Sequence, residues 1–427
     1  LFVGDNNSGK SYLMSLLWGI QNLGVDALLG SSVTADNRTE IEKEVFEWIE
    51  IQVNTALEQM ECVVPVSSII DKLQILLQEK LDRNKNDLIK KIFNSPAVVI
   101  EKLVIKLQGL SGGFLNFKWI NESRIFRVIL EINGDFSETG FIFGKNLLKY
   151  EEDDDWLIIR LIYKLFMDIN LNEYTINEGI YLPSARTGFM LTKDLINKVS
   201  RKAVYNIDTE EEIVPFVRPV NQFLDVINDL SIENLSDNIF SDIVKDLEKG
   251  LIDGSINMSA LPNKEVRYFP AGCTEELPLR VASAVVTELA PLILILKYKE
   301  KLDMLFYEEP EMCLHPQLQQ KIAKVICRLV NAGLNMIVTT HSDIILQHIN
   351  NMIRLSNRRD AAVVCEQFGY STQDLLSMEK VKVYQLNAKA GGMTEVEELE
   401  CGEYGFAVPT FNQALERIND EAYVIQE

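Results

Sequence analysis

Two hydrophobic rhythms along the chain predict different elements. Apolar residues recur at helical spacing from Leu13 to Ile20, which predicts a helix over residues 10–23. Toward the other end, compact apolar runs alternate with helical patterns, which is typical of a β-α-β-α chain. The strands expected there are "LDMLFYEE" and "LNMIVTTHS", and the expected helices span residues 277–299, 316–331 and 341–351.

The middle of the chain has a different pattern. Mixed-charge amphipathic stretches over residues 38–60 and 66–96 predict two or three helices. Three β-prone runs follow, "FLNFKWI", "RIFRVILEI" and "GFIFG". The turn signals "NES" and "NGDFSET" between them predict an antiparallel meander. Helical patterns return over residues 154–170 and 190–250.

Strand and helix signals at both chain ends enclose this largely helical middle. The apolar stub "LFV" before Gly4 is too short for a whole strand, so we expect the chain to begin inside one. The last segment pairs "VKVYQL" with "TEVEELE" across an "NAKAGG" turn and closes with a helix from Thr410. This arrangement predicts one α/β core that carries a large, mainly helical insertion.

Composition narrows the classes of partner. The chain has 427 residues, of which 47% are hydrophobic, and its formal net charge is −21. Such a charge argues against broad nucleic-acid binding, although "KLDRNKNDLIKK" could still line a local basic groove. Six scattered cysteines without a CxxC spacing indicate reduced thiols and a cytoplasmic location. No apolar run approaches the roughly 20 residues that span a bilayer, so we expect no membrane partner.

The segment "GDNNSGKS" carries the first chemical signal, because it matches G-x-x-x-x-G-K-[ST] in full. Gly4 and Gly9 permit a bend that points several N–H groups inward, Lys10 can reach the β- and γ-phosphates, and the Ser11 hydroxyl can ligate magnesium. The helix that follows directs its dipole toward the bound anion. The residues predicted to bind nucleotide here are Gly4, Asp5, Asn6, Asn7, Ser8, Gly9, Lys10 and Ser11.

Two later strands end in polar side chains that fit the same chemistry. In "LFYEEPE", Glu308 can hold magnesium through water, and Glu309 can orient the attacking water or accept its proton. In "VTTHSD", His341 follows a strand and can contact the γ-phosphate. The sequence therefore predicts Glu309 and His341 as catalytic residues, with Ser11 and Glu308 at the metal.

The order of these motifs resembles the ABC-type ATPases of the SMC, RecF and OLD group. "GDNNSGKS" is followed by a long insertion and then by "ELPLRVASAVVTEL", "LFYEEPEMCLHP" and "VTTHSD". The likeness extends to the branch of AAA-type ATP-binding proteins in anti-phage systems such as PARIS and Septu. It implies ATP and Mg²⁺ as cofactors, His341 as a switch histidine, and residues 311–316 as the D-loop at a dimer interface.

The resemblance also implies a division of the chain and a composite site. Ser283 would begin a signature helix that caps the ATP of a partner subunit in a head-to-tail dimer or higher homo-oligomer. The expected parts are a nucleotide-binding core in residues 1–32 and 271–427, a helical insertion in 33–110, an antiparallel β-meander of the core in 111–150, and a helical arm in 151–270 that leads to the signature helix.

Ser283 is followed by Ala284 rather than by glycine, which favours slow turnover and a switching role. The leading hypothesis is therefore an ATPase that senses a phage trigger protein and controls a separate nuclease or toxin. A RecF-like repair ATPase that binds DNA is the alternative. A transporter ATPase would need a Q-loop glutamine that we do not find. Arg186 in "PSARTG" is either a phosphate-sensing or interface cation or an ordinary loop residue.

Overall fold

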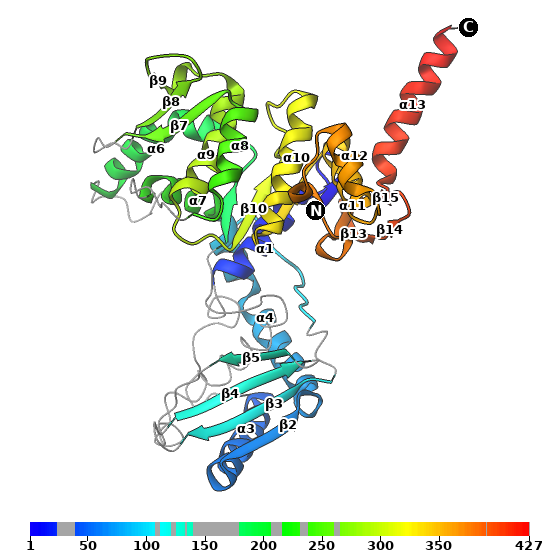
Figure 1. Cartoon of the computed structure of the whole chain (residues 1–427). Coiled ribbons are helices and arrows are strands. Elements are labelled where there is room, and N and C mark those ends of the chain that lie inside the picture. Colours follow the sequence, from blue (N-terminus) through cyan, green and yellow to red (C-terminus); the bar gives the residue numbers. More distant parts are fainter. Residues whose placement is uncertain are drawn as a thin grey trace. The chain divides into compact units, whose positions relative to one another are not determined.

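The chain forms two compact units in a computed structural model (Figure 1). One unit combines Leu1–Trp18 with Asn177–Glu427, and the other is Gly19–Ile176, so the boundary lies within helix α1 (Lys10–Asn22). The structure describes residues 1–23, 39–106, 112–120, 125–132, 135–139, 179–205, 216–230, 238–259, 265–389 and 391–426.

A six-stranded sheet organises the unit built from the two chain ends. Its strand order is β13-β12-β1-β11-β10-β6, with β13 antiparallel to β12 and every other neighbouring pair parallel. The carboxyl ends of parallel strands lie at the same edge of the sheet, and ligands of open α/β sheets bind at that edge. The strands are β1 (Phe2–Gly4), β6 (Ile180–Leu182), β10 (Met304–Glu308), β11 (Asn335–Thr339), β12 (Val383–Ala388) and β13 (Thr394–Leu399).

Helix α9 (Ala284–Tyr298) lies in the core of this unit. It is apolar on nearly all sides and contacts α6 (Arg186–Tyr205), α7 (Arg218–Asp229) and α8 (Ser241–Gly250). A helix that is hydrophobic all round is held by its surroundings on every face. The remaining elements are β7 (Gly254–Met258), β8 (Val266–Pro270), β9 (Leu277–Pro278), α10 (Pro316–Asn331), α11 (Asp343–Ser356), α12 (Ala361–Phe368), β14 (Cys401–Gly402), β15 (Gly405–Phe406) and α13 (Pro409–Gln426).

The second unit packs two helices with an antiparallel sheet of strand order β2-β3-β4-β5. A capping box at Thr39 and Glu42 begins its first helix, and Glu42 also forms a buried ion pair with Lys80. Its elements are α3 (Glu40–Gln59), β2 (Glu61–Pro65), α4 (Ile70–Phe93), β3 (Phe114–Ile120), β4 (Ile125–Ile132) and β5 (Asp135–Thr139).

Most predicted elements are confirmed. The α/β class, the first helix, the strands at "LDMLFYEE" and "LNMIVTTHS", and the C-terminal hairpin all appear where the pattern placed them. The predicted helix over residues 154–170 and the run "GFIFG" lie outside the described residues.

Two predictions about elements are wrong. The helix expected from residue 277 begins at Ala284, because β9 pairs with β8 and a short 3-10 turn follows it. The segment "DFSET", expected as a turn, forms β5. Strand β2 occupies the residues between the stretches 38–60 and 66–96, where the pattern predicted no element. The meander also groups with α3 and α4 instead of with the core, because β2 supplies its first strand. Such pairing is a long-range contact that local periodicity does not encode.

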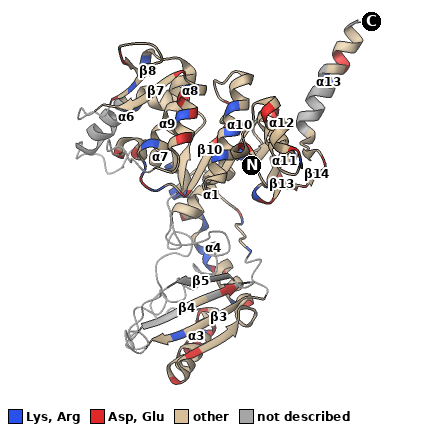
Figure 2. Ribbon diagram, in the orientation of Figure 1, with Lys and Arg blue, Asp and Glu red and all other residues tan. Residues whose placement is uncertain are grey.

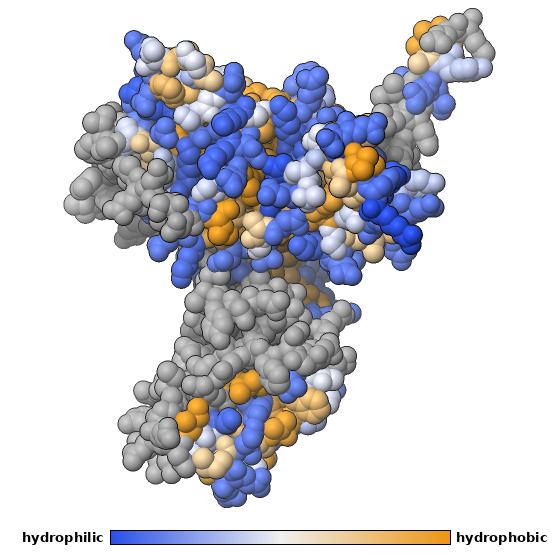
Figure 3. Space-filling model, in the orientation of Figure 1, coloured by the Kyte–Doolittle hydropathy of each residue, from blue (hydrophilic) through white to orange (hydrophobic). Residues whose placement is uncertain are grey.

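The described surface is mostly polar. Basic residues on α10, blue in Figure 2, each meet an acceptor: Lys321 donates to the carbonyl of Gly250, Lys324 to that of Gly369, and Arg328 pairs with Asp374. On the face drawn in Figure 3, the apolar residues of the first unit form small patches among hydrophilic ones. Within the described residues, no helix combines the length and apolarity that crossing a membrane requires.

Candidate nucleotide site

The loop between β1 and α1 has the backbone of a phosphate cradle. Gly4 has φ 145° and Gly9 has φ 90°, values that L side chains rarely adopt. A Cβ on Gly4 would lie 2.5 Å from the carbonyl oxygen of Leu386, so only glycine fits there. Asn7 takes the left-handed conformation at φ 61°, which asparagine tolerates well. The loop therefore turns tightly enough to present its N–H groups to an anion.

Lys10 places its ammonium group inside this loop. Its Nζ donates to the carbonyl oxygens of Gly4 at 2.9 Å and Asp5 at 2.8 Å, and it lies 3.3 Å from the Ser8 hydroxyl. Burial lowers the pKa of Lys10, and the nearby charges of Glu309, Asp5 and Glu311 oppose that shift. The phosphate loop and the acidic end of β10 thus surround the ammonium group of Lys10, which can donate hydrogen bonds to phosphate oxygens.

Glu308, the last residue of β10, has one oxygen that is free for a ligand. Its Oε2 accepts a hydrogen bond from the Ser184 N–H at 3.2 Å, while Oε1 is buried without a hydrogen-bond partner. A buried, unpartnered carboxylate oxygen is costly unless a cation or its water completes it. Mg²⁺ is commonly held by one or two carboxylates together with substrate phosphates, so this side chain fits the ion. Ser11 is exposed at the start of α1, as the hydroxyl ligand would need.

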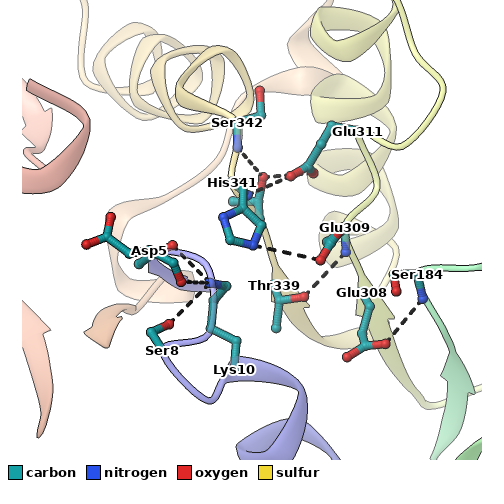
Figure 4. A network of polar contacts seen from close by, with 12 residues as sticks. Asp5, Ser8, Lys10, Ser184, Glu308, Glu309, Glu311, Thr339, His341 and Ser342 are labelled. Carbon is teal, nitrogen blue, oxygen red and sulfur yellow. Dashed lines mark hydrogen bonds and ion pairs between the residues drawn. The ribbon is translucent and has the colours of Figure 1, made fainter. Parts of the chain in front are cut away.

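Glu309 projects from a constrained backbone beside the loop (Figure 4). Its φ of 41° is uncommon for a residue with a side chain. Its N–H donates to the carbonyl oxygen of Thr339 at 2.9 Å, which ties β10 to the end of β11. The Glu309 Oε1 lies 3.8 Å from Nε2 of His341, so the two predicted catalytic residues face each other.

His341 is positioned by the carboxylate of Glu311. Glu311 accepts hydrogen bonds from the His341 N–H at 2.6 Å and from the Thr340 hydroxyl at 2.8 Å. Burial raises the pKa of Glu311. Burial also lowers the pKa of His341, and the charge of Lys10 lowers it further. Both effects favour the neutral imidazole, which can accept or donate a hydrogen bond without adding charge.

Arg186 does not lie in a loop and is not exposed to an interface. It is the first residue of α6 and is completely buried. Its guanidinium donates to the carbonyl of Glu309 at 2.9 Å and to that of Glu308, and it pairs with Glu288 at 2.7 Å. The side chain is therefore neither an ordinary loop residue nor an exposed cation: its two terminal nitrogens are held by neighbours of its own unit, and its buried Nε has no hydrogen-bond partner among the described residues.

Ser283 is the N-cap of α9, and its hydroxyl accepts from the Val286 N–H at 3.4 Å. Both Ser283 and Ala284 are exposed. Ser283 is not among the residues labelled in Figure 4, which come from α1, β10, β11 and the loops that follow β1, β6, β10 and β11. The exposed end of α9 thus remains free to meet another molecule.

Two contributors were not predicted from the sequence. The Thr394 hydroxyl of β13 donates to the carbonyl oxygen of Ser8 at 2.9 Å and so supports the phosphate loop from the far end of the chain. Glu288 holds Arg186 from within α9. A glutamate inside the apolar run "AVVTELAPLILIL" was the one available signal, since a charge in a buried helix needs a partner.

Comparison with known proteins adds a family and a set of distant structural likenesses. The sequence model of the family described as "AAA ATPase domain" matches residues 1–346. A search of curated proteins gave no match. An SMC head bound to the C-winged helix domain of ScpA is 14% identical with TM-score 0.34, and the match covers 93% of this chain and 89% of that one. The Smc head with an extended coiled coil, bound to a ScpA C-terminal domain derived from Pyrococcus furiosus, is 14% identical with TM-score 0.30, over 98% and 92%. The SMC head domain from Thermotoga maritima is 10% identical with TM-score 0.27, over 76% and 87%.

Proposed function

Because the chain belongs to the AAA ATPase domain family, it is an ATPase that binds ATP, and we propose that it serves as a slow, nucleotide-dependent switch that controls a separate effector protein. The observation that carries this proposal is the convergence of Lys10, Glu309 and His341 at one edge of a parallel sheet. Cation, carboxylate and neutral imidazole are the groups needed to bind a triphosphate and to direct water at its terminal phosphorus.

Each residue has a role in this proposal. Lys10 binds the β- and γ-phosphates, and Ser11 with Glu308 would hold Mg²⁺, which would supply positive charge to neutralise the phosphate oxygens. Glu309 orients the attacking water and accepts its proton. His341 donates a hydrogen bond to the γ-phosphate, with its orientation fixed through the backbone contact to Glu311.

A second copy of the chain completes the site in this proposal. The exposed N-terminus of α9 carries a helix dipole and the Ser283 hydroxyl, and both can meet the γ-phosphate held by the other subunit. Ala284 stands where a glycine would allow the closest backbone approach, so hydrolysis is slow and the ATP-bound dimer is long-lived. A long-lived dimer suits a switch better than a motor.

The effector in this proposal is a separate nuclease or toxin. This assignment rests on the motif order that this chain shares with ATPases of anti-phage systems, in which the controlled partner is a nuclease or toxin and the trigger is a phage protein. The net charge of −21 favours a basic partner surface. DNA itself receives less support, because Lys80 of the candidate basic segment is buried against Glu42, and Arg83 and Lys85 have acidic neighbours.

Replacing Lys10 tests the switch. We expect Lys10→Ala to weaken ATP binding roughly 100-fold, since truncating one partner of a buried charge pair costs about 3 kcal/mol. Fluorescent-nucleotide titration measures this, with Lys245→Ala as the control, because Lys245 pairs with Asp242 on the exposed side of α8. In cells that carry the gene with its neighbours, Lys10→Ala should also abolish protection in a phage challenge. Full protection by that variant would refute the switch.

A further inference from the structure

A single buried side chain joins the strand end that carries Glu309 to helix α9. Arg186 donates to the carbonyl oxygens of Pro183 at 2.9 Å, of Glu309 at 2.9 Å and of Glu308. On its other side it forms an ion pair with Glu288 at 2.7 Å. The exposed fractions of the two side chains are 0% and 2%, so neither charge is solvated by bulk water. The planar fork of arginine is suited to several fixed acceptors at once.

The contact continues from Glu288 along the first turns of α9. Glu288 accepts from the Thr187 N–H at 3.1 Å and from the Thr187 hydroxyl at 2.6 Å. The hydroxyls of Thr187 and Thr287 lie 3.1 Å apart, and the Thr287 N–H donates to the carbonyl of Ser283 at 3.0 Å. The start of α6 therefore fixes the segment of α9 that begins at Ser283.

The contact also reaches the backbone of Glu309. That residue has a left-handed φ of 41°, an uncommon conformation that its surroundings must impose. Thr339 holds its N–H and Arg186 holds its carbonyl oxygen. Arg186 thus supplies half of the restraint on the peptide that directs the carboxylate.

A contribution to folding stability does not by itself explain why a buried ion pair is present at this position. A buried ion pair is often no more stabilising than apolar residues of the same volume, because desolvation offsets the attraction. The pair is buried in the core of this unit, and the ring of Tyr307 lies 4.9 Å from the guanidinium carbon. A charged pair kept there at the junction of three site elements points to control of geometry.

We propose that the Arg186–Glu288 pair is a positioning element for ATP hydrolysis, which fixes Glu309 in its own site and, through α9, sets the place of Ser283 in the site of the partner subunit. This inference rests on the proposed function. Within one subunit, the two half-sites would then shift together, so that binding at one is felt at the other.

The test removes both charges and keeps the volume and the acceptor that Thr187 needs, as Arg186→Met/Glu288→Gln. We expect kcat to fall roughly 10- to 100-fold, the size of effect that a misplacement of about 1 Å produces, with the Kd for ATP within about threefold of wild type. ATP-dependent dimerisation, followed by analytical ultracentrifugation with a slowly hydrolysed analogue, should weaken in parallel.

The matched control is another arginine–carboxylate pair of this unit, altered as Arg328→Met/Asp374→Asn, in which Asp374 is buried and the Arg328 side chain is 17% exposed. It joins the last turn of α10 to the turn at residues 372–374 and touches no site residue in the described structure. We expect it to change Tm while leaving kcat and dimerisation unchanged. Arg186→Lys, which keeps the charge but loses the fork, serves under the same criteria if the double variant fails to fold.

The outcomes separate clearly. Wild-type kcat and dimerisation in the folded Arg186 variants would overturn the proposal, and so would an equal loss of ATP affinity and kcat, which indicates general damage to the site. Failure of the wild-type protein to bind ATP, or of Lys10→Ala to lose binding, would instead refute the proposed function, and this is measured before any Arg186 variant is made.

Discussion

The phosphate loop and the start of helix α9 are two candidate halves of one site, and they are built in opposite ways. The loop is local: Gly4, Gly9 and Lys10 lie within a few residues and impose its shape by backbone conformation. The start of α9 is an ordinary helix cap, and its place depends on contacts between residues about a hundred positions apart, chiefly Arg186 with Glu288. The first half is therefore specified by a motif and the second by packing.

This difference predicts where each half tolerates change. A loop that needs φ near 90° and 145° and close backbone contact has no substitute for glycine. The first residues of helix α9 can vary as long as the contacts that position the helix, chiefly Arg186 with Glu288, are kept. Ala284 in place of glycine is an example of such variation.

The largest effect should come from the first half, through Glu309→Gln. We expect kcat to fall about 100- to 1000-fold, since general base catalysis contributes that much, while ATP binding remains. The loss is measured by single-turnover hydrolysis of labelled ATP. Glu395→Gln, an exposed glutamate of β13 paired with Lys389, is the control. An unchanged kcat in Glu309→Gln would remove this residue from the reaction.

Ser283→Ala tests the second half and should have a smaller effect. Loss of the N-cap costs about 1 kcal/mol of stability, and loss of the hydroxyl should lower kcat about tenfold, in line with one hydrogen bond to a charged group. Thr39→Ala removes a comparable cap in the other compact unit and should lower Tm without lowering kcat. Equal kcat in both variants would make Ser283 a structural cap only.

Mixing the Glu309→Gln and Ser283→Ala proteins tests whether the phosphate loop of one subunit and the start of α9 of another form one site. In a head-to-tail dimer of Glu309→Gln with Ser283→Ala, one site carries both defects and the other carries neither. Random mixing makes half of the dimers mixed, so about a quarter of the wild-type rate should return. If both halves acted within one subunit, the mixture would only average the two defective proteins.

The sequence predicted the first half well and the second half poorly, for the same physical reason. The roles assigned to Lys10, Glu309 and His341 follow from motifs at strand ends, and the structure brings these three residues together at one edge. Arg186 was undecided, because its meaning depends on Glu288, which no local spacing relates to it. Likewise the five residues of β2, between two amphipathic stretches, carry no strand signal of their own, because they become a strand only by pairing with β3.

The smallest expected effect concerns pH and the imidazole of His341. Burial and the neighbouring Lys10 lower the pKa of His341 below its ordinary value of 6.5, so it is neutral throughout the range above that value. The folded state then binds fewer protons than the unfolded state between the two pKa values, and the stability contribution of this group, complete above pH 6.5, is lost as pH falls toward the folded pKa. We expect kcat to stay constant from pH 8 to about pH 6.5 and to decline below it.

Variants of two histidines assign that decline. His341→Gln should have a lower kcat but no acid decline, whereas His348→Gln should keep the wild-type profile. Burial and Lys324 lower the pKa of His348 as well, so both histidines affect Tm at acid pH, yet only His341 faces the phosphate loop. With three histidines in the chain, NMR of labelled imidazoles can follow each titration directly. A measured His341 pKa above 6.5 would contradict the neutral imidazole. It would also contradict the view that the charge of Lys10, as the cation of the phosphate loop, lowers the pKa of His341.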